Sequence, residues 1–165
     1  MSTTGPAPTD VPPQVGDLAP DFTLPTDAGA PLTLSSLRGR PVVLYFYPRA
    51  DTATCTAQAC ALRDLFPRFD AAGAVVLGVS PDTVRAQARF RAKYALPFTL
   101  LADADHAVAE AYGVWAEKQM YGRRFLGVER TTFVLDRAGR VARVFPRVRV
   151  PGHAEAVAEA LAELG

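Results

Sequence analysis

Cys55 and Cys60, the only cysteines in the chain, are the residues whose type and spacing point most directly to chemistry. An apolar, aromatic run stops at Pro48, a short polar turn follows, and a helix-forming pattern resumes with Cys55 in its first turn. Free backbone N–H groups and the positive end of the helix dipole stabilise a thiolate there. The pattern therefore predicts a nucleophilic thiol with a second thiol five residues further along.

The length and composition of the chain limit the classes of protein to which it can belong. The 165 residues are 49% hydrophobic with a formal net charge of +1, which fits one domain and predicts no strong attraction to nucleic acid or anionic lipid. Residues 1–14 hold four prolines but neither a basic start nor an apolar stretch, so we expect a flexible tail and not a secretory signal. We expect one folded domain over residues 15–165, located in the cytoplasm, where close thiol pairs are seldom structural.

The hydrophobic pattern predicts alternating strands and helices. We expect strands at 41–47, 74–80 and 98–101, helices at 52–66, 83–94 and 106–112, a hairpin of 130–135 with 141–145, and a final helix after Gly152. Pro67 is expected to end or kink the first helix. A β-α-β unit followed by a hairpin and a helix is the order of a thioredoxin-like fold. The fold class is therefore α/β, with a central mixed sheet flanked by helices.

The run Pro48-x-x-x-Thr52-x-x-Cys55 resembles the active-site signature of the peroxiredoxins. With Cys60 five residues on, the chain is similar to the bacterioferritin comigratory protein, or peroxiredoxin Q, subfamily. The similarity extends through residues 16–22, 37–39, 76–80, 112–115 and 130–133. This resemblance implies a thiol peroxidase that needs no cofactor and no metal.

By this resemblance Cys55 attacks the O–O bond of hydrogen peroxide or an organic hydroperoxide and becomes a sulfenic acid. Cys60 then condenses with it to an intramolecular disulfide, which thioredoxin or a similar dithiol reduces. Thr52 and Arg130 orient the peroxide and the thiolate, and Pro48 shapes the pocket wall. Arg130, the Thr52 hydroxyl and the Cys55 N–H are the expected donors to the departing oxygen. Resolution within one chain removes the chemical need for a dimer, so we expect a monomer. The small net charge leads us to expect neither nucleic-acid nor membrane partners.

The spacing of the two thiols adds a conformational prediction. In a regular helix, positions five apart have Cα atoms about 8.7 Å from each other. Disulfides seldom tolerate more than about 7 Å. The helix must therefore unwind around Cys55 to Cys60 when the disulfide forms. Ala53 and Thr54 stand where the family usually has Pro-Gly, a difference that bears on substrate preference and not on the chemistry.

Other interpretations of the same residues lead elsewhere. The thiols could serve a protein thiol-disulfide oxidoreductase, or a non-catalytic redox sensor or holdase, or they could be inert or structural. A metal site is disfavoured because His106 and His153, the only histidines, lack ligand spacing to the thiols. Both histidines are predicted to be solvated residues at helix starts. Without the family resemblance, Arg130 would be an arginine at a strand edge that pairs with a surface acid.

Overall fold

The computed structural model describes residues 11–164. The predicted flexible tail falls mostly on residues 1–10, outside the described residues. Residues 11–14 lie against the body of the molecule, since a β-carbon on Gly113 would come within 2.6 Å of the Pro12 nitrogen. Gly113 has φ +66°, so the close approach and the backbone conformation both require glycine.

Nine strands and five α-helices make up the described part of the chain. The strands are β1 (Thr23–Pro25), β2 (Pro31–Thr33), β3 (Val42–Phe46), β4 (Val75–Ser80), β5 (Thr99–Ala102), β6 (Trp115–Met120), β7 (Arg123–Val128), β8 (Thr131–Leu135) and β9 (Val141–Phe145). The helices are α1 (Ala53–Asp64), α2 (Phe66–Ala71), α3 (Val84–Lys93), α4 (Ala107–Ala111) and α5 (His153–Glu163), with a 3₁₀ turn at Leu34–Leu37.

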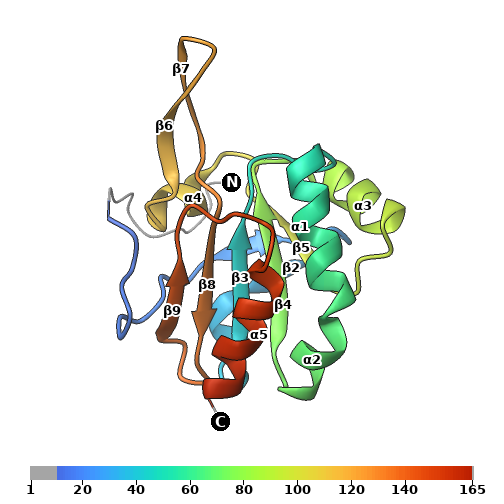
Figure 1. Cartoon of the computed structure of the whole chain (residues 1–165), viewed down its shortest axis with the longest axis vertical. Helices are drawn as coiled ribbons and strands as arrows, with labels where there is room; N and C mark the ends of the chain where they lie inside the picture. The colour runs from blue at the N-terminus through green and yellow to red at the C-terminus, as the bar shows by residue number, and fades with distance from the viewer. Residues whose placement is uncertain (1–10, 165) are drawn as a thin grey trace.

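The central sheet has five strands in the order β5-β4-β3-β8-β9. Strand β3 pairs in parallel with β4 and antiparallel with β8, so the sheet is mixed. Figure 1 shows α1 and α5 in front of this sheet and α4 behind it. The predicted α/β fold class, with helices flanking a central mixed sheet, is confirmed.

Strand β3 is buried on both faces, which explains its continuous apolar run. Val42, Leu44 and Phe46 point into one apolar cluster, while Val43 and Tyr45 point into the other. The second cluster also holds the buried apolar residues of α1 and α5. Alternation along a single strand therefore joins the two halves of the core and fixes α1 against the sheet.

Two hairpins and one helix boundary differ from the sequence prediction. Strands β1 and β2 pair with each other, and β6 with β7, but neither hairpin was predicted. The β6–β7 hairpin is mostly exposed, so its sequence carries no strong hydrophobic alternation. Pro67 neither ends nor kinks α1, which already ends at Asp64; instead it lies in the first turn of α2, where its missing N–H costs nothing.

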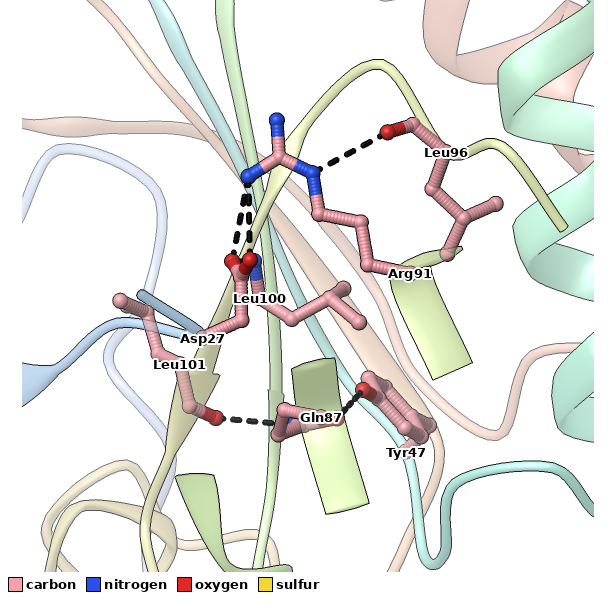
Figure 2. Close-up of polar contacts among 7 residues, drawn as sticks. All are labelled: Asp27, Tyr47, Gln87, Arg91, Leu96, Leu100 and Leu101. Atoms are coloured by element: carbon pink, nitrogen blue, oxygen red, sulfur yellow. Dashed lines mark hydrogen bonds and ion pairs between the residues drawn. The ribbon is translucent and has the colours of Figure 1, made fainter. Parts of the chain in front are cut away.

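A buried polar network ties the end of β3 to α3 and β5 (Figure 2). The Tyr47 hydroxyl donates to Gln87 Oε1 at 2.6 Å, and Gln87 Nε2 donates to the Leu101 carbonyl at 2.8 Å. Close by, the Arg91 guanidinium lies 3.2 Å from the Asp27 carboxylate and also donates to the Leu96 carbonyl. These bonds fix the strand end from which the chain turns towards α1.

The prediction that His153 is solvated is wrong. Its exposed fraction is only 6%, its ring lies edge-on to Phe145, and its Nε2 is 3.0 Å from Thr132 Oγ1. Gly152, with φ +79°, turns the chain so that the first residue of α5 points inward onto β8. Burial, and secondarily the charge of Arg130, lower the pKa of His153 to about 4.

His106 precedes α4 as predicted, but its ring is not simply solvated. The ring stacks on Trp115 with centroids 3.8 Å apart, and Nδ1 is 3.0 Å from Glu110 Oε2. The imidazole therefore links α4 to the base of the β6–β7 hairpin.

The buried histidine predicts how stability depends on pH. Because the folded pKa of His153 is below its unfolded value of about 6.5, the unfolded chain binds the extra proton. The contribution of neutral His153 to the free energy of unfolding is complete above pH 6.5 and is lost as the pH falls towards 4. The free energy of unfolding should drop by about 2 kcal/mol between pH 7 and pH 5 from this group alone. Urea denaturation of wild type and His153→Gln should show a shallower pH dependence in the variant; identical slopes would contradict the assignment.

Candidate active site

The register of the central sheet brings together two distant parts of the chain. Phe46, the last residue of β3, pairs with Thr131, the first residue of β8. Because the two strands are antiparallel, the loop that leaves β3 meets the residue that precedes β8. That residue is Arg130, and the loop leads directly into α1.

Three side chains hold this loop in place. The Ala50 N–H donates to Asp82 Oδ2 at 2.7 Å. Asp51, at φ +61°, accepts hydrogen bonds from Lys93 Nζ at 2.9 Å and from the Tyr94 hydroxyl at 2.8 Å. The hydrogen bonds from Lys93 and Tyr94 lower the pKa of Asp51, which keeps it ionised. The loop is thus fixed to α3 and to the turn before it, and this sets the start of α1.

Cys55 is the third residue of α1, which follows Thr52 as the N-cap. The N–H groups of the first helical turn have no intrahelical partner and point towards the helix start. The thiol is 2% exposed and free, and Arg130 Nη2 lies 3.3 Å from its sulfur. The structure therefore brings together two of the predicted site residues, which are 75 positions apart.

Gln58 completes this arrangement and was not predicted. Its Oε1 accepts a hydrogen bond from Arg130 Nη1 at 2.7 Å, and its side chain is 1% exposed. Residues three apart on a helix share a face, so the position of Gln58 relative to Cys55 was the available signal. The guanidinium is held by Gln58 with one nitrogen while the other faces the sulfur.

Thr52 and Pro48 lie on the loop, and within residues 11–164 neither makes a hydrogen bond to the thiol. The Thr52 hydroxyl donates to the Arg49 carbonyl at 2.9 Å, and its side chain is exposed. Its proton is therefore engaged, which leaves its oxygen as an acceptor and not the donor that the sequence suggested. Pro48 is half-buried at the start of the loop, directly after Tyr47.

Cys60 lies further along the same helix, is partly buried, and is also a free thiol. Regular helix geometry places its Cα about 8.7 Å from that of Cys55. The two predicted reactive thiols are therefore on one helix but are not positioned for a disulfide.

Buried polar atoms without a partner gather around α1. In residues 11–164 the buried side-chain atoms that lack a hydrogen-bond partner are the Tyr45 hydroxyl, the Thr56 hydroxyl and the Gln58 amide nitrogen. Thr56 and Gln58 lie between the two cysteines, and Tyr45 belongs to the apolar cluster that contains Cys55. Each such atom costs about 1–3 kcal/mol that hydration would return. The segment between the thiols is the least satisfied part of the interior.

Two structural features are absent from residues 11–164. No group of three or more His, Cys, Asp or Glu side chains among them could hold a metal ion. None of the helices that they form is long and apolar enough to cross a membrane.

A thioredoxin-like sheet that carries a buried thiol at a helix start, with a guanidinium beside it, is the arrangement of a thiol-dependent peroxidase. A model of the AhpC/TSA family matches residues 15–144. Peroxiredoxin Bcp of Bacillus subtilis is 42% identical over 92% of this chain and 94% of its own length. Peroxiredoxin Bcp of Escherichia coli K12 is 41% identical over 91% and 96%.

Solved structures agree with these relatives. The Xanthomonas campestris bacterioferritin comigratory protein, studied for its alkyl peroxide reduction activity, superposes with a TM-score of 0.83 at 41% identity, covering 87% of this chain and 92% of that one. A Mycobacterium tuberculosis relative, BcpB, gives a TM-score of 0.83 at 37% identity over 93% and 99%. The chain belongs to the AhpC/TSA family and is a peroxiredoxin of the Bcp/peroxiredoxin Q type. It is a thiol peroxidase with two cysteines.

The contact between Gln58 and Arg130 predicts a loss of rate when the acceptor is removed. Gln58→Met keeps the length and burial of the side chain but leaves Arg130 Nη1 without its partner. We expect oxidation of Cys55 by hydrogen peroxide to slow about tenfold, in line with the loss of one charge-assisted hydrogen bond. Single-turnover kinetics measure this, with Gln119→Met on the exposed face of β6 as the control. A rate within twofold of wild type would show that Gln58 does not position the guanidinium.

Proposed function

We propose that this peroxiredoxin reduces hydrogen peroxide and organic hydroperoxides through a Cys55 sulfenic acid, that Cys60 resolves it as an intramolecular disulfide, and that thioredoxin or a similar dithiol recycles it. One observation carries the proposal: the Cys55 sulfur lies in the first turn of α1 at 3.3 Å from Arg130. Anion-stabilising groups meet at that sulfur from two directions, the helix start and the guanidinium.

In the first step the Cys55 thiolate attacks one peroxide oxygen. A sulfur–oxygen bond forms as the O–O bond breaks, and the other oxygen leaves with the electron pair, to be protonated as water or alcohol. Cys55 is oxidised to sulfenic acid and the peroxide is reduced. The Arg130 guanidinium and the Cys55 N–H stabilise the charge on the departing oxygen. The Thr52 oxygen, whose proton is engaged by Arg49, accepts from the peroxide O–H and so orients it.

In the second step the Cys60 sulfur attacks the Cys55 sulfur. The sulfur–oxygen bond breaks, and hydroxide leaves with the Cys60 proton as water. The helix between the two thiols must unwind first, because regular α1 holds them too far apart. The unpaired Thr56 hydroxyl and Gln58 amide support this step, since water satisfies both once the segment opens.

Other details of the proposal come from a relative and from the sequence. Organic hydroperoxides enter it because the Xanthomonas campestris relative is studied for alkyl peroxide reduction. Ala53 and Thr54 are exposed at the start of α1, where a substrate approaches the thiol. The pocket-forming role of Pro48, the monomeric state, the cytoplasmic location and the domain division remain predictions.

The alternatives differ in what they consume. A protein thiol-disulfide oxidoreductase would reduce insulin disulfides and consume little peroxide. A redox sensor or holdase would bind partners after oxidation but turn over peroxide slowly. The guanidinium beside the thiol favours the peroxidase over the oxidoreductase, because thiol-disulfide exchange releases no oxyanion for the guanidinium to stabilise.

Peroxide consumption with thioredoxin, thioredoxin reductase and NADPH tests the two-cysteine cycle. We expect rapid turnover by wild type and none by Cys55→Ser or Cys60→Ser. Cys60→Ser should still react once, giving a sulfenic acid that mass spectrometry or a dimedone adduct detects. Full turnover by Cys60→Ser would remove the proposed resolving role, and slow oxidation of wild-type Cys55 would favour the sensor.

The unpaired Thr56 hydroxyl predicts the rate of the second step. Thr56→Val keeps the shape of the side chain and removes a buried group that the folded helix leaves unsatisfied. The variant should hold α1 more firmly and form the disulfide about tenfold more slowly, while Cys55 oxidises at the wild-type rate. Stopped-flow oxidation followed by acid-quenched mass spectrometry separates the two steps.

Thr99→Val on β5 is the matched control, since it makes the same chemical change away from α1. Amide exchange of the reduced protein should show greater protection over residues 55–60 in Thr56→Val only. Unchanged exchange and an unchanged resolution rate would mean that the unpaired hydroxyl has no part in unwinding.

A further inference from the structure

Lys118 differs from the other cations of the β6–β7 hairpin because its side chain does not extend into solvent. The stem crosses the neighbouring strand at Gly127, where an added β-carbon would lie 3.3 Å from Lys118 Cδ. The ammonium then donates to the Val128 carbonyl at 2.9 Å. By contrast, Arg124 is exposed and pairs with Glu117. Glycine at 127 therefore gives Lys118 a path across the hairpin to the end of β7.

The carbonyl that Lys118 binds belongs to the segment that delivers Arg130 to the thiol. Val128 is buried, and the next residue, Glu129, donates its N–H to the Val114 carbonyl at 2.7 Å. The Arg130 carbonyl in turn accepts from the Val148 N–H at 2.9 Å. Lys118 thus supplies one of the bonds that fix the backbone two residues before the guanidinium.

The charge of Lys118 also interacts with the charges of Cys55 and Arg130 at the site. Among residues 11–164 it has no ion-pair partner, although it is only partly exposed. Burial is the main cause that lowers its pKa, the charge of Arg130 lowers it further, and the charges of Cys55 and Glu129 act in the opposite direction. A desolvated cation that is repelled by a second cation gains from a nearby anion, and Cys55 provides one whenever its thiol loses its proton for the reaction.

We propose that Lys118 is a positioning residue for peroxide reduction: it fixes the segment that carries Arg130 and adds a second positive charge that stabilises the Cys55 thiolate. The proposal rests on Cys55 being the peroxide-reactive thiol and is independent of Cys60. Other ionisable groups that interact electrostatically with Cys55 or Lys118 include Arg130, Glu129, Tyr45 and Tyr47. Burial raises the pKa of both tyrosines, so they stay neutral in the range of the test.

The test uses full-length protein with Cys60→Ser, so that Cys55 is the only thiol. Lys118→Met keeps the stem and removes the charge, Lys118→Arg keeps the charge, and Arg124→Met removes an exposed hairpin cation as the control. The pH dependence of Cys55 alkylation by iodoacetamide reports the thiolate, and stopped-flow oxidation by hydrogen peroxide reports the reaction. Circular dichroism confirms that each variant is folded.

We expect Lys118→Met to shift the alkylation profile upward by about half a pH unit, the effect of one partly screened charge. Its oxidation should slow about tenfold. Lys118→Arg and Arg124→Met should stay close to the parent protein in both readouts. An unshifted profile in Lys118→Met, or an equal shift in Arg124→Met or Lys118→Arg, would overturn the proposal. If the parent protein were not oxidised by peroxide, the proposed function would fail, while the alkylation profiles would still decide the role of Lys118.

Discussion

The contact between the Arg130 guanidinium and the Cys55 sulfur is the interaction on which the rest of the site depends. It joins the start of a helix to the start of a strand 75 residues later, and no local preference of either segment would create it. The pairing of Phe46 with Thr131 brings these two segments near each other, because it places the end of β3 beside the start of β8. Gln58 Oε1 then fixes the orientation of the guanidinium, by accepting a hydrogen bond from one of its nitrogens so that the other faces the thiol.

The same helix has two opposed tasks. It must be ordered for Cys55 to face Arg130, and it must open for Cys60 to reach the oxidised sulfur under the proposed mechanism. Hydrogen bonds support the loop where order is needed, since Asp51, just before α1, accepts from Lys93 and Tyr94. Between the thiols, in contrast, Thr56 and Gln58 leave polar atoms unpaired in the interior. The stability of the folded helix is thereby reduced in the segment that must unwind under the proposed mechanism.

An element could be predicted from the sequence when its own residues determine its structure, and could not when distant parts of the chain determine it. Strands β3, β4, β8 and β9 were predicted because their own residues are β-branched and aromatic runs bounded by turn-forming residues. The β6–β7 hairpin was missed because most of its residues face solvent and carry no apolar alternation. His153 was misassigned because its burial depends on the positive φ of Gly152 and on where β8 lies, which are properties of the tertiary structure.

The functional residues divide in the same way. Cys55, Thr52 and Pro48 form a compact motif, and the family resemblance extended it to Arg130. Gln58 is one helical turn from Cys55, yet its role became visible only when Arg130 was found against it. The engaged proton of Thr52 and the path of Lys118 across Gly127 depend on rotamers and strand register, which no sequence pattern specifies.

Under the proposed mechanism, Arg130 accelerates the reaction with peroxide by stabilising the departing oxygen, and not only by holding the thiolate. Arg130→Lys keeps the charge but loses the two-nitrogen fork. The most direct measurement compares, in this variant and in wild type, the rate of Cys55 oxidation by hydrogen peroxide with its rate of alkylation by iodoacetamide. If Arg130 stabilises the departing oxygen, oxidation should fall by about a hundredfold or more and alkylation by less than about tenfold. Equal losses in the two reactions would contradict it.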